Sequence, residues 1–457
     1  MNIIELALSN YQKSLLDSSS SSVNQSCTIQ ECDENVILTT PKAVTNLVDM
    51  LCHHNSKCNE TVSFVLEKND GCSLHYKLRC DICTYNSVWR TSLELPENRD
   101  LINLKVTHAF LCSGMLPSQV ERFCDCIGVS TLYKRKQNEY VEEYSKHVHS
   151  ERISSCETAL AEELSVHNSV DIITDARHST RRNSKYTDIV CIGYNTHKVL
   201  DHEVIRREDD SCSQRHELHG TKRIYENFDT KGVHVRRHGH DRNASVNKFV
   251  REQRKSTVNQ NDTWHVSVSV EKELKKISSG AKCREGKTWS VQLADKVQPV
   301  KTHIQFAMRS CNGDASKLRS NIENIVDHYQ NKHSNCDMNS RCRKDSNYIP
   351  SRVILTDSNA VNLLSNALRS TDVYRHPECY VHHMDTFFVE SFNNVLNIFQ
   401  DKRIGTFGDL HYKLRSNLAI CHWNENVKRK TNSFQYRKNI WSRCISSLFS
   451  GSVWRPY

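Results

Sequence analysis

Residues 168–205, NSVDIITDARHSTRRNSKYTDIVCIGYNTHKVLDHEVI, decide the fold of this chain. They contain three runs rich in β-branched and apolar residues, SVDIITD, YTDIVCIGY and HKVLDHEVI, which short polar links separate. Such runs predict β-strands, and short links between successive strands predict antiparallel neighbours. We therefore expect a three-stranded meander near the middle of the chain.

The segments that follow extend this sheet. A helical pattern runs from about Gln214 to Asn227, the run GVHVRRHGHD at 232–241 predicts a fourth strand, and a second helical pattern covers about Asn243 to Arg254. The order β-β-β-α-β-α is typical of the RNase H-like (retroviral-integrase-like) fold, in which the fourth strand runs parallel to the first after a helical crossover. We expect an α/β core of this class.

Three carboxylates occupy positions where such a core would gather them. Asp175 ends the first predicted strand, Asp241 ends the fourth, and the helix predicted in DTFFVESFNNVLNIFQDK (385–402) carries Glu390. Glu390 lies with Asn393, Asn394 and Asn397 on the face opposite to an apolar stripe of Phe388, Phe392, Val395, Leu396 and Phe399. Carboxylate oxygens hold Mg²⁺ or Mn²⁺, and a pair of such ions supports phosphodiester cleavage. Taken singly, either Asp could instead be a turn cap.

The stretches around these carboxylates resemble Mutator-like DDE transposases, in particular animal proteins with a Mutator-like transposase domain. The resemblance covers about Cys80 to Asn426 and is carried by TDARHSTRRNSKYTDIVCIG, THKVLDHEV, SQRHELHGTKRIYENF, HGHDRNASVNKFVRE, NDTWHVSVSVEKEL, SCNGDASKLRSNI and FVESFNNVLNIF. It implies that Asp175, Asp241 and Glu390 form the catalytic triad and bind Mg²⁺ or Mn²⁺. Relatives more often have Asp-Gly at the first position, whereas Ala176 follows the first Asp here.

The same resemblance draws attention to Trp264 and His265. They match a C/W-x-H element that follows the second Asp in Mutator-like proteins, where a histidine near the active site is expected. We expect His265 to orient DNA or a metal-bound water; the alternative is a histidine packed in a strand.

The spacing of the triad predicts an insertion. Asp241 lies 66 positions after Asp175, but Glu390 lies 149 positions after Asp241, which is too far for a bare RNase H-like core. We therefore divide the core into 167–255 and 370–426, separated by a mostly helical insertion at 256–369. Within the insertion, a structural Zn²⁺ site is predicted at Cys311, His328, His333, Cys336 and Cys342. A helix could present both histidines only if it ended between them; surface histidines and buried free thiols are the alternative.

Residues 43–98 predict a small α+β module upstream of the core. A helical pattern begins at Ala43, and two alternating runs flank Asn69, Asp70 and Gly71, which is a strong hairpin signal. Directly after the second run, Cys80 and Cys83 form a C-x₂-C knuckle suited to Zn²⁺. The upstream residues that could complete the site are Cys52, His53, His54, Cys58 and Cys72, most simply Cys52 with Cys58. A coincidental pair in a cysteine-rich chain is the alternative.

Residues 99–166 predict a helical region. Within it, MLPSQVERFCDCIGVSTLYKRKQ (115–137) has a helix, a glycine turn and a second helix at the spacing of a helix-turn-helix. Pro117 suits a first helical turn, Gly128 the turn and Ser130 the N-cap of the second helix. That helix would carry Tyr133 and a basic face for DNA, formed by Lys134, Arg135 and Lys136. An ordinary helical hairpin with a solvated basic end is the alternative. Further DNA contacts are predicted beside Asp175, at Arg177, Arg181, Arg182 and Lys185.

Composition agrees with a nucleic-acid partner. The formal net charge is +9, and 24 histidines add positive charge where they protonate. No long apolar run or secretory signal is visible, so we expect an intracellular protein that does not enter membranes and whose 20 cysteines are mostly reduced. The Ser-rich residues 1–42 predict a flexible leader, and residues 427–457 a basic tail.

These features together predict a DDE-type transposase that cleaves transposon ends and transfers strands to target DNA. The resemblance implies a homodimer or higher oligomer, and the DNA substrate implies a nuclear location. Two alternatives remain at this point: a domesticated, non-catalytic DNA-binding protein that keeps the fold, and a structure-specific nuclease of the RNase H fold.

Overall fold

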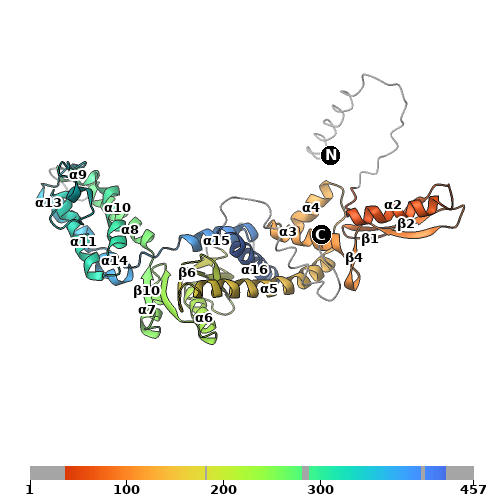
Figure 1. Cartoon of the computed structure of the whole chain (residues 1–457), viewed down its shortest axis with the longest axis horizontal. Coiled ribbons are helices and arrows are strands. Elements are labelled where there is room, and N and C mark those ends of the chain that lie inside the picture. Colours follow the sequence, from red (N-terminus) through yellow and green to blue (C-terminus); the bar gives the residue numbers. More distant parts are fainter. Residues whose placement is uncertain (1–35, 181–182, 280–287, 403–406, 429–457) are drawn as a thin grey trace, which may run out of the picture. The chain divides into compact units, whose positions relative to one another are not determined.

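The computed structural model describes residues 36–180, 183–279, 288–402 and 407–428. The chain combines α-helices with a mixed β-sheet and divides into two compact units (Figure 1). Of the described residues, the first unit comprises 36–103 and 118–133, and the second comprises 104–117 and those from 134 to 428. The predicted leader lies mostly, and the C-terminal tail almost wholly, outside the described residues.

The first unit contains a helix and a three-stranded antiparallel sheet in the order β1-β2-β3. The predicted hairpin is confirmed, because β1 and β2 pair on either side of Gly71, whose φ is 69°. Asn103 closes this turn by accepting a hydrogen bond from the Cys72 amide at 2.9 Å and donating to the Asp70 carbonyl at 2.8 Å. The elements are α2 (Pro41–Asn55), β1 (Ser63–Asp70), β2 (Ser73–Arg79), β3 (Asn86–Arg90), β4 (Glu94–Leu95), η1 (Pro96–Asn98) and β5 (Arg99–Asp100).

The region of the predicted helix-turn-helix differs from the expectation. Helices α3 (Leu101–Cys112) and α4 (Pro117–Cys126) form, and Gly128 makes the turn with a φ of 69°. The next helix, α5 (Lys134–Leu164), begins beyond Ser130, whose hydroxyl accepts a hydrogen bond from Asn69 at 3.0 Å. Ser130 is therefore not its N-cap, and Tyr133 precedes it. α5 is 31 residues long and belongs to the second unit, whereas nearly all of α4 belongs to the first.

The second unit is built on a five-stranded sheet with the order β10-β9-β6-β7-β8. The first three strands form the predicted antiparallel meander, and β9 runs parallel to β6, which confirms the predicted order. The edge strand β10 was not predicted, because its polar sequence VNQN lacks an apolar alternation. The elements are β6 (Val170–His178), β7 (Tyr186–Gly193), β8 (Val199–Arg206), η2 (Ser213–Arg215), α6 (His216–Thr230), β9 (Val235–His240), α7 (Ala244–Gln253) and β10 (Val258–Asn261).

Helices cover both faces of this sheet. Apolar side chains of α6, α7 and the C-terminal part of α5 share a buried cluster with the strands. Helices α15 (Phe387–Phe399) and α16 (Asp409–Asn426) contact the meander as well, and every residue of β7 is buried. The central strands therefore lie inside the core, which holds their C-terminal ends in fixed positions.

The helices between β10 and α15 pack around a core of their own (Figure 1). Leu274, Ile304, Ile322 and Leu364 are among its buried residues, and the cluster also includes Tyr380. Its elements are α8 (Thr263–Ser278), α9 (Thr288–Ala294), α10 (Val297–Ser310), α11 (Ala315–Tyr329), α12 (Arg341–Lys344), α13 (Ser358–Arg369), α14 (Asp372–Arg375) and η3 (Pro377–Cys379). Among the described residues, no helix is both long and apolar enough to cross a membrane.

Candidate functional site

Asp175 and Asp241 follow the last paired positions of two neighbouring parallel strands. Thr174 on β6 is in register with His240 on β9, so the next residue along each strand is one of the two aspartates. β9 ends at His240, whereas β6 continues to His178 by pairing with β7. Asp175 therefore lies one residue beyond the point where β9 stops pairing with β6. Contrary to the sequence prediction, it does not end β6.

Glu390 lies in the first turn of α15. The predicted stripe is largely confirmed, because Phe392, Leu396 and Phe399 are buried. Glu390 is half exposed on the other side, and Asn393 on the same face donates a hydrogen bond to Oδ2 of Asp175 at 2.9 Å. The helix that carries the third carboxylate is thus joined directly to the strand that carries the first.

His265 lies between the second and third carboxylates. Its Nε2 is 3.4 Å from Oδ1 of Asp241 and 3.4 Å from Oε1 of Glu390, and the ring is half exposed. His265 lies in the first turn of α8, not in a strand, because Asp262 caps this helix by accepting from the His265 amide at 2.7 Å. The other oxygen of Asp262 accepts from the Thr386 amide at 2.7 Å, which anchors the segment leading into α15.

The carboxylates repel one another in a partly buried setting. Burial, followed by repulsion from Asp241, raises the pKa of Asp175 to about 8. Burial also raises the pKa values of Asp241 and Glu390, while the neighbouring His265 opposes the increase in both. Negative groups held together against their own repulsion are typical of functional sites, where a cation or a proton relieves the repulsion.

Glu217 is a fourth acid in this region that the sequence analysis missed. It lies in the first turn of α6, and its Oε2 accepts a hydrogen bond from Asn243 at 2.7 Å. Its Oε1 is buried with no hydrogen-bond partner among the described residues. Burial, with a contribution from Asp241, raises its pKa to about 7. The sequence carries no signal for it, since an acid in a first helical turn is ordinarily there for the helix dipole.

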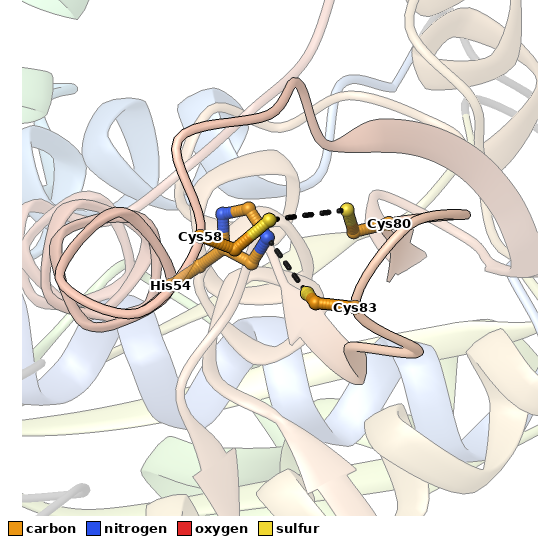
Figure 2. Close-up of side chains that lie close together, drawn as sticks. All are labelled: His54, Cys58, Cys80 and Cys83. Carbon is orange, nitrogen blue, oxygen red and sulfur yellow. Dashed lines mark hydrogen bonds between the residues drawn. The ribbon is translucent and has the colours of Figure 1, made fainter.

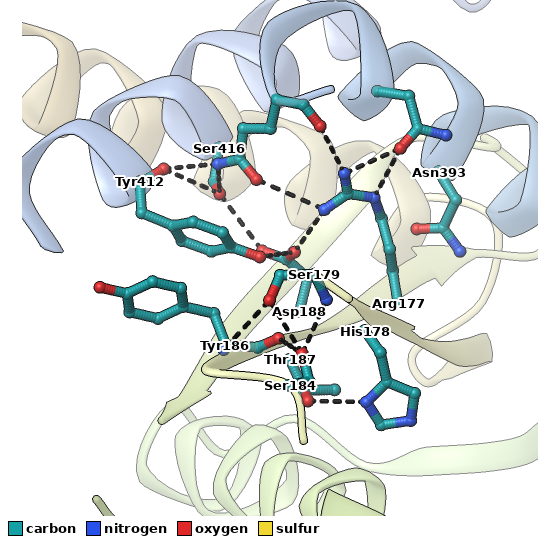
Figure 3. A network of polar contacts seen from close by, with 12 residues as sticks. Arg177, His178, Ser179, Ser184, Tyr186, Thr187, Asp188, Asn393, Tyr412 and Ser416 are labelled. Carbon is teal, nitrogen blue, oxygen red and sulfur yellow. Dashed lines mark hydrogen bonds and ion pairs between the residues drawn. The ribbon is translucent and has the colours of Figure 1, made fainter. Parts of the chain in front are cut away.

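Arg177 does not have the exposed position that a phosphate contact requires. It is 3% exposed, its Nη1 lies 3.0 Å from Asp188, and its guanidinium also donates to Asn397 at 2.8 Å and to the Gln400 carbonyl at 2.7 Å. Figure 3 shows this arginine between the strands of the meander and the two C-terminal helices. The arginine therefore serves to hold α15 against the sheet, which corrects the expectation of a DNA contact.

The other predicted DNA contacts vary in accessibility. Lys134 and Arg135 are exposed at the start of α5, where Arg135 pairs with Glu139 at 3.2 Å, and Lys136 is partly buried. The side chain of Lys185 is 39% exposed. Arg181 and Arg182 lie outside the described residues.

A basic cavity of about 590 Å³ lies between α7 and the segment around α14. Its lining includes Arg242, which directly follows Asp241, and Arg251 from α7, together with Arg375 and His376 from the end of α14. Asp372 is the acidic residue of the lining and lies 3.7 Å from Arg242. The sequence analysis missed this cavity because its two walls come from segments more than a hundred positions apart.

A cysteine and histidine cluster forms in the first unit, but with a different ligand set from the one favoured by the sequence. His54, Cys58, Cys80 and Cys83 bring their ligand atoms within 4.8 Å of one another (Figure 2). The Cys58 and Cys80 sulfurs are 4.0 Å apart, and the Cys83 sulfur is 3.3 Å from Nε2 of His54. Cys52 is exposed and outside this group.

A second cluster lies at the end of α11. His328, His333, Cys336 and Cys342 also bring their ligand atoms within 4.8 Å of one another. The helix ends at Tyr329, between the two histidines, as the spacing required. Cys311 is not part of the group: it is fully buried, and its thiol donates to the Met308 carbonyl at 3.1 Å.

Comparison with known proteins gives one family. The family described as Mutator-like transposase matches residues 34–342, which is about two thirds of the chain. This region includes both cysteine and histidine clusters, Asp175 and Asp241. No curated protein matches the chain.

Proposed function

The chain belongs to the Mutator-like transposase family, and from this premise we propose that it is a DDE-type DNA transposase with an RNase H-like core. In this proposal Asp175, Asp241 and Glu390 are its catalytic carboxylates. The observation that carries the proposal is the proximity of three acids, from β6, from the residue after β9 and from α15. Asp241 and Glu390 each lie 3.4 Å from His265, and both repel the ionised form of Asp175. The sheet order, with β9 parallel to β6, supports an RNase H-like core.

The donor set fits hard divalent cations. Asp175, Asp241 and Glu390 offer carboxylate oxygens, which Mg²⁺ and Mn²⁺ prefer. Burial first, and repulsion from neighbouring acids after it, raises their pKa values, and a bound cation would favour their ionised forms. When bound, such ions activate a water or a 3′-hydroxyl and stabilise the leaving oxygen of the phosphodiester. Asn393 would orient Asp175, and His265 would hold Asp241 and Glu390 near each other.

Basic side chains near the carboxylates support a DNA substrate. Arginine binds phosphate through two parallel hydrogen bonds, and the cavity beside Asp241 presents Arg242, Arg251 and Arg375. Elsewhere on the second unit, Lys134 and Arg135 are exposed at the start of α5, and the side chain of Lys185 is 39% exposed. A protein that acts on chromosomal DNA would work in the nucleus, and self-association would bring two transposon ends together.

The test is a cleavage and strand-transfer assay with the full chain, labelled terminal-repeat DNA, a target plasmid and Mg²⁺ or Mn²⁺. Asp175→Asn, Asp241→Asn and Glu390→Gln keep the shapes of the side chains, and each should lower the cleavage rate about a hundredfold or more while DNA binding persists. Glu252→Gln, an exposed acid on α7, is the matched control and should retain the wild-type rate.

Two results would overturn the proposal. Tight binding of terminal-repeat DNA by the wild type, without cleavage in either metal, would leave a domesticated DNA-binding protein. Cleavage that survives all three substitutions would remove the catalytic assignment of these carboxylates.

A further inference from the structure

We propose that His54, Cys58, Cys80 and Cys83 bind one structural Zn²⁺ ion in the first unit. This inference does not depend on the catalytic proposal, because it concerns a separate set of residues and a different kind of ligand atom. It rests on the distances within the cluster, the backbone of the knuckle and the environment of the histidine.

The distances fit a tetrahedral ion. With the usual zinc–sulfur and zinc–nitrogen bond lengths, two thiolates on one ion are about 3.8 Å apart, and a thiolate and an imidazole nitrogen about 3.6 Å. The Cys58–Cys80 separation of 4.0 Å and the Cys83–His54 separation of 3.3 Å lie close to these values. The sulfurs are not disulfide-bonded, so all three thiols remain free to coordinate.

The loop between β2 and β3 has the backbone of a metal knuckle. The Cys80 amide donates to the Tyr85 carbonyl at 3.0 Å, which closes the loop around the two cysteines. Thr84 has a φ of 58°, a left-handed conformation that is costly for a β-branched residue. Bonds from an ion to Cys80 and Cys83 would offset this local cost.

The histidine is arranged as a ligand rather than as a surface residue. His54 is 2% exposed in the last turn of α2, and its ring lies against Tyr85 with centroids 5.0 Å apart. Its Nδ1 lies 3.4 Å from Oδ1 of Asn55, which favours a proton on Nδ1 and leaves Nε2 to face the cysteines. The ion would tie the end of α2 to the β2–β3 turn (Figure 2).

The ligand atoms also select the metal and its role. Three thiolates and one imidazole suit Zn²⁺, whereas Mg²⁺ and Ca²⁺ require oxygen ligands. Four protein ligands complete the tetrahedron and leave no position for a substrate, so the ion would be structural. The module needs such a link, since Phe64, Val65 and Leu66 on β1 are all about half exposed and the strand buries little apolar surface.

A second, independent observation supports a second Zn²⁺ ion at His328, His333, Cys336 and Cys342. The Cys336 sulfur lies 3.5 Å from Nδ1 of His328 and 3.7 Å from Nδ1 of His333, and the Cys342 sulfur lies 3.8 Å from Nδ1 of His328. These distances match the tetrahedral value. Between α11 and α13 the described chain forms only the short helix α12, so an ion there would hold a long irregular segment in place.

Metal analysis of the full chain, purified under reducing conditions, tests both sites. We expect two zinc ions per wild-type chain. The double variants Cys80→Ser with Cys83→Ser, and Cys336→Ser with Cys342→Ser, should each lose one. Cys52→Ser and Cys311→Ala are the matched controls, since both cysteines lie outside the clusters, and they should keep two.

Cobalt substitution covers the case in which a serine variant fails to fold. Replacing zinc by Co²⁺ in the folded wild-type chain should give thiolate-to-cobalt charge-transfer bands and the intense visible absorption of tetrahedral Co²⁺. Cys83→His, which keeps a zinc ligand, should retain the metal. A wild-type chain that takes up neither Zn²⁺ nor Co²⁺ would overturn both assignments; unchanged zinc in one double variant would overturn that site alone.

Discussion

Asp188 shows how a charged network close to the carboxylates can be structural. It is fully buried and faces Arg177 and His202 at 3.0 Å each. Tyr412 and Ser416 donate hydrogen bonds to it, and Figure 3 shows both of them with Arg177 around the carboxylate. Burial alone would raise the pKa of Asp188, but its contacts with His202 and Arg177 outweigh burial and hold the pKa below its usual value. Removing one partner from such a pair leaves the other charge buried and uncompensated.

Arg177→Gln should therefore lower the free energy of unfolding by about 3–5 kcal/mol. Lys185→Gln is the control, since Lys185 is 39% exposed and its contacts are weak, with Asp409 at 3.6 Å and the Tyr186 ring at 4.9 Å; its effect should stay within about 0.5 kcal/mol. Denaturant unfolding followed by circular dichroism measures both. If both variants unfolded like the wild type, Arg177 would be available for DNA and the structural role would be refuted.

The site also shows which properties of a single side chain can be predicted from the sequence. Asp175, Asp241 and Glu390 were singled out by position: each Asp follows a predicted apolar strand run, although β6 continues past Asp175, and Glu390 lies on the polar face of an amphipathic helix. Burial of an individual polar residue has no such signature. Arg177 was therefore assigned to DNA, Glu217 was missed, and Cys52 was preferred to His54, although only the histidine points from α2 into the cluster.

At the scale of elements, the spacing of apolar residues predicted the helices and strands that pack through apolar faces. The meander was predicted because its central strand, β7, is apolar enough to be buried on both faces, and α15 because it has one apolar face. β10 was missed because Asn259, Gln260 and Asn261 are buried through hydrogen bonds and not through apolar contacts; the Gln260 side chain, for example, donates to the Glu378 carbonyl at 2.8 Å. Ser130 was predicted to cap the next helix, but α5 begins at Lys134, and the Ser130 hydroxyl accepts a hydrogen bond from Asn69, a partner that local sequence does not reveal.

The basic cavity, which Arg251 of α7 and Arg375 of α14 line, should contribute to DNA affinity through contacts with phosphates. Arg251→Ala with Arg375→Ala should weaken binding and reduce the slope of log affinity against log salt by about 0.9 for each phosphate that the variant no longer neutralises. Lys276→Ala, an exposed lysine on α8, is the control and should leave the slope unchanged. Fluorescence anisotropy across a salt series measures the slope. A double variant with the wild-type slope would show that the cavity does not hold phosphates.

At the scale of the whole molecule, the chain has a formal net charge of +9 but gathers Asp175, Glu217, Asp241 and Glu390 in one region. Asp175 and Glu217 have pKa values raised to about 8 and about 7, mainly by burial, so both take up protons when the chain folds. A group whose pKa is higher in the folded chain stabilises the folded state fully when the pH lies below its pKa in the unfolded chain. This contribution is lost as the pH rises through its pKa in the folded chain. The stability of the metal-free chain and its affinity for divalent cations should therefore be linked through pH.

We expect the metal-free wild type to lose stability from these acids as the pH rises from about 4 to about 8. Buried histidines such as His238, whose pKa burial lowers, titrate with the opposite sign, so the quantity to measure is the difference from Asp175→Asn. At pH about 8.5, Asp175→Asn should melt about 4 °C or more above the wild type, with the gap closing as the pH falls to about 4. Mg²⁺ should raise the wild-type melting temperature at the higher pH and leave the variant nearly unchanged, because binding favours the ionised carboxylates. If Mg²⁺ raised the melting temperature of both proteins equally, or if their difference in melting temperature did not change with pH, Asp175 would not be a ligand of the cation.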